Sequence, residues 1–270
     1  MTLRRRKGIA LMLALWLIVL LTVLGARVVS SARSASGVAS NLRARLLGRY
    51  AAESGIVLAS AQMRDSLALV TDAASRAAYL NSLQPGSASS AEISIGEQRC
   101  SVVYIDVNSR VDINNASQVQ LAKLFAYFVG PVDALSAAKA VRTWTGADGG
   151  PQAERRRYGS DRIDLSYPTM PAARPLRTLE ELRRIPGVPE RLALAAVPYL
   201  TVDGDGRINR SAASDTVLAA AAGSLVDEPS RILIISRGWL NGHALTHEIQ
   251  AVYSIDGVSV VLVRWQERDL

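Results

Sequence analysis

The clearest feature of the chain is an uncharged apolar run from Ile9 to Ala26, followed by apolar residues that recur at helical spacing. Eighteen uncharged residues at the rise of an α-helix nearly span the hydrocarbon core of a bilayer, which needs about 20. A segment in lipid must satisfy its backbone internally, so this run should be a helix. The helical pattern continues without proline to about Leu83, which predicts a transmembrane helix over 9–26 and a long helix over 27–83.

Beyond Gln84-Pro85-Gly86 the pattern changes to short strands, then to helices, and finally back to strands. Strand composition predicts a sheet built from residues 84–111 and 226–270, with strands at 92–95, 101–107, 232–236, 243–255 and 258–265. Between them, residues 112–225 form an insertion with helices expected at 116–128, 132–144, 178–184, 189–197 and 214–222, and a long loop at 145–176. The fold class is therefore α+β: a long N-terminal helix packed on an antiparallel sheet, with a large helical insertion.

Charge is concentrated at the N-terminal end of the chain. Residues 1–50 hold nine basic and no acidic residues, so the net +7 of the whole chain leaves about −2 for residues 51–270. Arg4, Arg5, Arg6 and Lys7 directly precede the apolar run and should keep the N-terminus cytoplasmic, which places the rest of the chain across the membrane. A slightly acidic folded part disfavours nucleic-acid binding, which needs basic residues on the domain itself.

Three interpretations of the N-terminal segment remain open at this point: a cleaved secretory signal peptide, a plain membrane anchor, and a helix that is trimmed and retained. The apolar run exceeds the usual signal-peptide core of about 7–15 residues, although Ser30 and Ala32 offer a weak cleavage site. The third interpretation depends on Gly8, between the basic and apolar runs. This leader, residues 1–8, resembles that of type IV pilins and pseudopilins, in which a membrane peptidase cuts on the cytoplasmic side, here between Gly8 and Ile9.

The insertion carries a second resemblance. It opens with Ile113-Asn114-Asn115-Ala116 and contains Trp144 before Asp148, a segment from Leu179 to Gly187, and a second Ile-Asn unit at Asn209. This order behind a pilin-like leader resembles the protein K family of the type II secretion system, the large minor pseudopilins. Asn114, Trp144, Gly187 and Asn209 carry the likeness. Leu13 adds to it, because most pilins have a glutamate at that position and protein K typically lacks one.

The resemblance implies a pilin-like fold and a structural role rather than an enzymatic one. It implies a single-pass protein of the bacterial inner membrane with a cytoplasmic N-terminus and a large periplasmic domain. The subunit would cap the tip of the pseudopilus and help initiate its assembly for protein secretion across the outer membrane. Expected partners are other minor pseudopilins, the inner-membrane assembly platform and the prepilin peptidase, with secreted exoproteins as further candidates and no nucleic acid.

Metal binding is a weaker expectation. The resemblance leaves calcium as a candidate cofactor, with Asp148, Glu154 and Asp161 as candidate ligands in the long loop, although that loop has fewer carboxylates than is usual for the family. Asp203-Gly204-Asp205-Gly206 is partly similar to a calcium loop, but it lacks the further spaced oxygens and terminal glutamate of an EF-hand, so a turn is expected. Cys100 is the single cysteine, which excludes an intramolecular disulfide and favours a core position.

Other functions remain as alternatives. Ile113-Asn114 and Ile185-Pro186-Gly187-Val188 resemble parts of helix-hairpin-helix DNA-binding motifs, and a minor pilin of a type IV pilus would share the same leader. His243 and His247 lie four residues apart in predicted strand, where we expect a solvated pair rather than a metal site. No serine, cysteine or carboxylate pair stands in a recognisable nucleophile setting, so catalysis is not expected.

Overall fold

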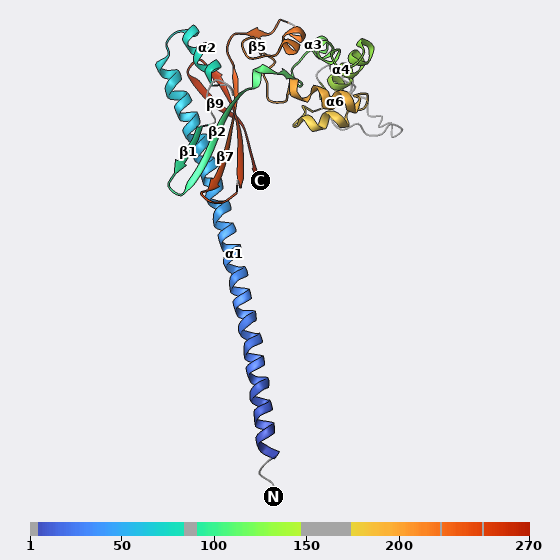
Figure 1. The fold of residues 1–270 in the computed structure, drawn as a ribbon. Coiled ribbons are helices and arrows are strands. Elements are labelled where there is room, and N and C mark those ends of the chain that lie inside the picture. The colour runs from blue at the N-terminus through green and yellow to red at the C-terminus, as the bar shows by residue number, and fades with distance from the viewer. Residues whose placement is uncertain (1–4, 84–90, 147–173, 222, 245) are drawn as a thin grey trace, which may run out of the picture.

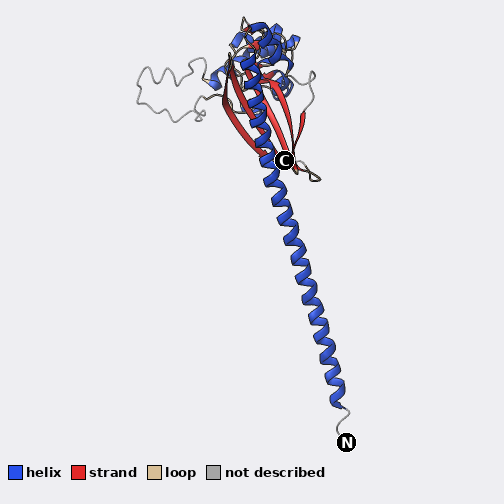
Figure 2. Cartoon of the chain, turned by 90° about the vertical axis from the view of Figure 1, so that its left-hand side faces the viewer, coloured by secondary structure: helices blue, strands red, loops and turns tan. Residues whose placement is uncertain are grey.

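A computed structural model of the chain describes residues 5–83, 91–146, 174–221, 223–244 and 246–270. Helix α1 (Arg5–Leu69) runs the length of the molecule: its upper part lies on a five-stranded sheet, and its lower part extends alone (Figures 1 and 2). A separate group of short helices projects to the side of the sheet (Figure 1). The predicted α+β class, with a long N-terminal helix, an antiparallel sheet and a helical insertion, is confirmed.

The long helix ends earlier than expected. We predicted continuous helix from residue 27 to about Leu83, but α1 stops at Leu69 and a second helix, α2 (Ala73–Ser82), begins after a break. Asp72 caps α2 by accepting a 2.8 Å hydrogen bond from the backbone N–H of Ser75. A capping aspartate satisfies free N–H groups only where a new helix starts, so it favours the break over continuation.

The sheet joins strands from both ends of the folded part. It is antiparallel throughout, in the order β1 (Ala91–Ile95), β2 (Gln98–Asp106), β7 (Arg231–Leu240), β8 (His247–Asp256) and β9 (Ser259–Asp269). Since β2 pairs with β7, everything between them forms an insertion that leaves and re-enters the sheet at neighbouring points. Strand β8 starts at His247 rather than at residue 243, because Gly242, at φ +79°, lies in the turn after β7.

Helix α1 lies directly on the sheet where two glycines face each other. A Cβ at Gly238 of β7 would overlap the backbone oxygen of Gly48 and the backbone nitrogen of Ala52. This close approach lets the buried face of α1, with Ile56 among its residues, pack against Ile234 and the other inward side chains of the sheet. Glycines that looked like weak points of the helix in the sequence therefore serve packing at residue 48.

The insertion has a hydrophobic core of its own, distinct from the helix–sheet core. Its described elements are η1 (Val107–Ser109), β3 (Val111–Asp112), α3 (Gln118–Phe125), α4 (Pro131–Thr145), η2 (Leu179–Arg184), α6 (Glu190–Ala196), η3 (Val197–Tyr199), β4 (Leu200–Thr201), β5 (Ile208–Asn209), α7 (Asp215–Ala220) and β6 (Leu225–Val226). The segment predicted as a helix at 178–184 is a 3-10 helix, which ends before Pro186. The two short parallel pairs, β3 with β4 and β5 with β6, were not predicted.

Candidate assembly site and domain junction

The lower part of α1 is a free stem. Every described side chain from Ala10 to Arg43 is exposed, and Ala44 is the first buried one. At 1.5 Å per residue this stem is about 50 Å long. Among the described residues, α1 is the one helix long and apolar enough to cross a membrane, with a mean hydropathy of 2.4 in its most apolar window and none of that window buried. Side chains such as Trp16, 68% exposed, would be strongly disfavoured in water, so the stem fits a membrane anchor.

The proposed processing residues lie at the start of this helix. The backbone of Arg5, Arg6, Lys7, Gly8 and Ile9 is helical and continuous with the stem. Arg4, the first of the basic topology residues, lies outside the described residues. Cleavage at this position would therefore remove only the basic end of α1 and leave the apolar stem intact.

A groove opens where α1 leaves the sheet. It encloses about 430 Å³ and is lined by Leu42, Arg45, Leu46, Arg49, His247, Glu267, Arg268 and Asp269. On its sheet side, Arg268 lies 2.6 Å from a carboxylate oxygen of the buried Glu248. Arg49 pairs with Glu53 at 2.9 Å and with Glu267 at 3.3 Å, and these two acids raise the pKa of its guanidinium.

His247 forms part of the groove and is not solvated, so the expectation of a solvated histidine pair was wrong. Its side chain is 7% exposed, whereas His243 is exposed in the turn before β8. The reason is strand pairing. Strand β9 pairs with β8 and brings Asp269 opposite His247, with Nδ1 of His247 and Oδ1 of Asp269 2.9 Å apart. Nε2 of His247 makes no hydrogen bond and lies 3.6 Å from Glu267.

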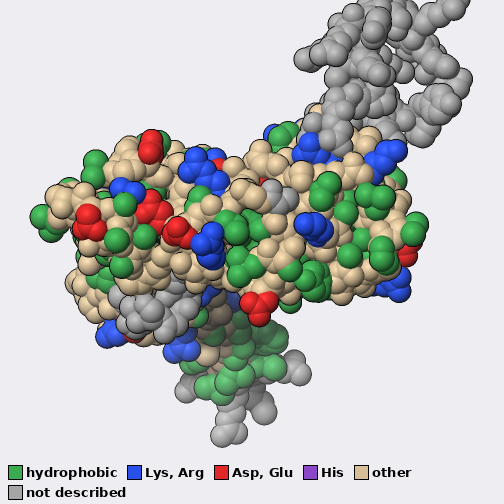
Figure 3. Space-filling view, turned by 90° about the horizontal axis from the view of Figure 1, so that it is seen from above, with side chains coloured by type: hydrophobic (Ala, Val, Ile, Leu, Met, Phe, Trp, Pro, Cys, Tyr) green, Lys and Arg blue, Asp and Glu red, His purple; other side chains and the backbone are tan. Residues whose placement is uncertain are grey.

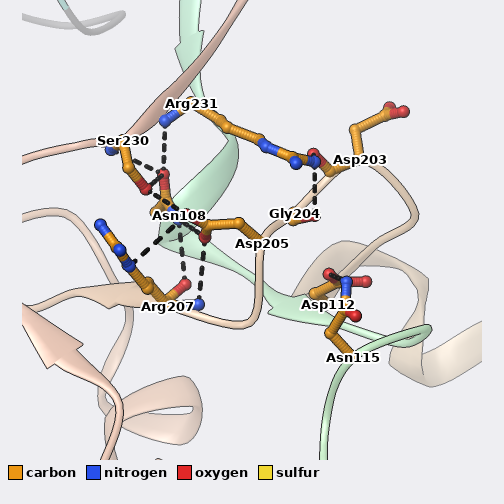
Figure 4. A network of polar contacts seen from close by, with 9 residues as sticks. All are labelled: Asn108, Asp112, Asn115, Asp203, Gly204, Asp205, Arg207, Ser230 and Arg231. Atoms are coloured by element: carbon orange, nitrogen blue, oxygen red, sulfur yellow. Dashed lines mark hydrogen bonds and ion pairs between the residues drawn. The ribbon is translucent and has the colours of Figure 1, made fainter. Parts of the chain in front are cut away.

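The insertion is joined to the sheet through a buried asparagine, Asn108 of η1 (Figure 4). Its amide nitrogen donates to Asp205 at 2.8 Å and to the Arg207 backbone oxygen at 3.1 Å. Its amide oxygen accepts from the backbone N–H groups of Ser230 and Arg231 at 3.0 and 2.8 Å. One side chain thus connects the end of β2, the 203–207 loop and the start of β7, which are the points where the insertion leaves and rejoins the sheet.

The acidic loop at 203–206 is part of this junction and does not fit a calcium site. Asp203 pairs with Arg264 of β9 at 2.9 Å, and Asp205 accepts from Ser230 Oγ at 2.7 Å. Burial raises the pKa of Asp203. For Asp205, burial also acts to raise the pKa, but hydrogen bonds from Ser230, Arg207 and Asn108 together outweigh it and lower the pKa. Both carboxylates already have protein partners, as expected for a structural turn.

The three candidate calcium ligands, Asp148, Glu154 and Asp161, lie outside the described residues. Within the described part of the chain no three His, Cys, Asp or Glu side chains come together as a metal site would require. Calcium binding at those three residues therefore stays a prediction. Cys100 is fully buried, and burial raises the pKa of its thiol, as fits a core residue.

Comparisons with known proteins show which proteins this chain resembles. Residues 80–204 match the family described as type II secretion system (T2SS), protein K. This match spans 125 of the 270 residues, so it shows that this part of the chain is similar to protein K. The fold is also similar to that of a chain in the crystal structure of the GspK-GspI-GspJ complex from the type 2 secretion system of enterotoxigenic Escherichia coli, with 14% identity and a TM-score of 0.54. That likeness covers 80% of this chain and 96% of the other. No curated protein matches the sequence.

The four residues that carry the sequence resemblance to protein K have structural contacts in this chain. Asn114 holds three segments together: it donates to the Leu176 and Val202 backbone oxygens at 3.0 and 3.3 Å and accepts from the Leu176 N–H at 2.8 Å. Asn209 is fully buried, and its amide nitrogen donates to Asn81 of α2 at 2.8 Å and to Asp106 at 2.7 Å.

The other two motif residues belong to the insertion core. Trp144, near the end of α4, packs partly buried against that core. Gly187 has φ +91° in the turn between η2 and α6, where a side chain would be strained, and its missing Cβ faces Ala140 of α4. All four residues thus take part in the packing or hydrogen bonding of the insertion, and none lines the groove.

Sequence reasoning missed both the groove and the Asn108 junction. Leu42 and Leu46 fall on the apolar pattern of the long helix, but the groove also needs the ends of β8 and β9, about 200 residues later in the chain. Asn108 directly follows the strand that the sequence predicts at 101–107. A local pattern gave no sign that its side chain would meet the 203–207 loop. The sequence signal that was available for the groove is the helical spacing of Arg45 and Arg49 beside Leu42 and Leu46.

Proposed function

We propose that this chain is the minor pseudopilin that caps the tip of the pseudopilus and helps to start its assembly. The match of residues 80–204 to the protein K family supports a minor pseudopilin role. The observation that carries the tip position is the size and placement of the insertion, a second core beside the sheet and far from the stem (Figure 1). A body this wide above the helix would obstruct a further subunit stacked on top, so it suits the end of a filament.

The stem supplies the anchoring part of this proposal. Before assembly, residues 9–26 would span the inner membrane, with Arg4, Arg5, Arg6 and Lys7 on the cytoplasmic side and the folded domain in the periplasm. A prepilin peptidase would cut between Gly8 and Ile9. The exposed apolar helix would then pack against the helices of neighbouring subunits as it leaves the bilayer, which replaces lipid by protein around the same side chains.

Its proposed partners are other minor pseudopilins, and the solved complex that resembles this fold contains GspK, GspI and GspJ. The inner-membrane assembly platform and the secreted exoproteins complete the set. We propose a structural subunit and not an enzyme.

The DNA-binding alternative has little support. The Val188 N–H of the hairpin already donates to the Ile185 backbone oxygen at 3.1 Å, so it is not available to a phosphate. Across the described residues seen from above, acidic and basic side chains are interspersed without a continuous basic patch (Figure 3).

Electron microscopy of overproduced pseudopili tests the proposal. An antibody against the insertion, used on filaments sheared from cells that carry the full-length chain, should label one end and not the shaft. Deleting the gene should abolish secretion and reduce the number of pseudopili, and the full-length chain should restore both. Label distributed along the shaft, or normal secretion without the gene, would contradict tip capping.

A further inference from the structure

We infer that helix α2 is a clamp that fixes the direction in which the insertion points, and that it acts through the ion pair of Arg76 with Glu228. When this pair opens, the insertion turns relative to the sheet while both hydrophobic cores stay folded. The inference concerns the mechanics of the chain and stands apart from the proposed function. Only its consequence rests on that function: in a capping subunit, the direction of the insertion decides which of its faces the next component of the machinery meets.

The insertion and the sheet are separate bodies joined by a hinge. Among the described residues, the insertion core and the helix–sheet core share no member. Residues 107–110 lead from β2 into the insertion, and residues 227–230 lead back into β7; we call these two segments the hinge. Domains move relative to one another unless a large apolar interface holds them. A fixed direction of the insertion therefore needs contacts that hold the hinge itself.

Asn108 ties the two hinge segments together (Figure 4). It lies in the first segment, is fully buried, and accepts hydrogen bonds from the backbone N–H groups of Ser230 and Arg231 at 3.0 and 2.8 Å. Breaking these bonds would leave buried polar groups without partners, which is costly. The bonds of Asn108 reach residues 205, 207, 230 and 231, so the outer end of the second segment, at 227–228, depends on another contact.

Helix α2 supplies that contact. Leu80 is 1% exposed in the helix–sheet core, so α2 belongs to the sheet body. From there Arg76 reaches both carboxylate oxygens of Glu228, with Nη2 2.7 Å from Oε1 and Nε 3.0 Å from Oε2. Asn81 of the same helix donates to the Asp227 backbone oxygen at 3.0 Å. A bidentate arginine–carboxylate pair fixes direction as well as distance, so α2 holds the second hinge segment in one orientation.

The break in the long helix places α2 at the hinge. Helix α1 stops at Leu69, and the capping bond of Asp72 starts a new helix one turn before Arg76. The new helix lies at the upper end of the sheet, where the insertion joins it (Figure 1). The break that local patterning did not predict thus has a use, because it brings an arginine to the return connection of the insertion.

The Arg76–Glu228 pair is the part of the clamp that can open. The two side chains are 27% and 31% exposed, so water can replace each partner at little cost. Asn209 of the insertion also donates to Asn81 at 2.8 Å, but Asn209 is fully buried. Its bond stays closed for the same reason as those of Asn108, and the two buried amides mark the axis about which the insertion turns.

Charge exchange between Arg76 and Glu228 tests the clamp in the full-length chain in detergent. Spin labels are attached at Ser94→Cys of β1 and Ser136→Cys of α4, two exposed positions, while the fully buried Cys100 stays unlabelled. Pulsed electron paramagnetic resonance then measures the distance between the labels. The native pair should give one narrow distance distribution. Arg76→Glu and Glu228→Arg should each broaden it about twofold, and the two together should restore the native width.

Arg183→Glu is the matched control, because it breaks an exposed ion pair with Glu190 inside the insertion and should leave the width unchanged. Circular dichroism of each variant should show native helix content. A narrow distribution in Arg76→Glu, a broad one in the native chain, or no recovery in the exchanged pair would overturn the inference. Unfolding of both single variants would also overturn it, since both cores are expected to stay intact. None of these results depends on the position of the chain in a filament, so the proposed function is tested separately.

Discussion

At the scale of single residues, the insertion is held on the sheet by a few buried amides whose polar atoms are all used. Asn108 and Asn209 are fully buried, and each bonds segments about 100 residues or more apart in the sequence. Asparagine suits this role because one short side chain offers two donors and an acceptor with two lone pairs. Removing such a group leaves several partners buried without a hydrogen bond, which costs more than the bonds themselves are worth.

Asn108→Ala should lower the free energy of unfolding by about 3 kcal/mol, since it deprives the Asp205 carboxylate and the Ser230 and Arg231 N–H groups of a partner. Urea unfolding of the full-length chain in detergent, followed by tryptophan fluorescence, measures this. Asn241→Ala is the control, because Asn241 is exposed and its side chain makes no hydrogen bond in the described structure. Equal, small effects of the two substitutions would contradict the role of Asn108.

At the scale of elements, the C-terminal strands are connected by a row of charges. Glu248 of β8 is buried and lies opposite Arg237 of β7 and Arg268 of β9, each at 2.6 Å. Burial, the largest single influence, acts to raise the pKa of Glu248. Bonds to Arg237 and Gln250 and the charge of Arg268 together outweigh it, so the pKa lies below its ordinary value of 4.5. The ionised carboxylate therefore connects three strands beside the groove.

This arrangement gives a pH dependence with a defined sign. A carboxyl whose pKa is lowered by folding stabilises the folded state above about pH 4.5, and that contribution is lost as the pH falls through the folded pKa. Glu248→Gln should cost about 2 kcal/mol at pH 7 and clearly less at pH 3. Glu97→Gln, at an exposed ion pair, should show no such difference. A Glu248→Gln effect that stays constant between pH 7 and pH 3 would contradict the account.

The sequence predicted the order of elements well, because each depends on local patterning: the apolar run, the helical spacing and the strand composition. It failed where the outcome depends on distant contacts. The break before Asp72 and the burial of His247 follow from cap geometry and strand pairing. The Asn108 junction needs a loop about 100 residues away. The candidate metal residues lie outside the described residues, so their role stays a prediction.

At the scale of the whole molecule, three parts with different physical needs are joined in one chain. The stem needs lipid or other helices around it, the sheet needs the upper half of α1 as its cover, and the insertion has its own core. Removing the stem would leave the two cores intact but detach them from the membrane. Anchoring and filament assembly therefore both require that the apolar helix stays on the mature protein.

The N-terminus of the mature, membrane-extracted protein tests this requirement most directly. Full-length chain is expressed with and without a prepilin peptidase, and its N-terminus is determined by sequencing and intact mass. The account predicts an N-terminus at Ile9 when the peptidase is present and an uncut leader when it is absent. An N-terminus beyond Ala26, for example at Ala35, or an uncut Met1 in both strains, would contradict it.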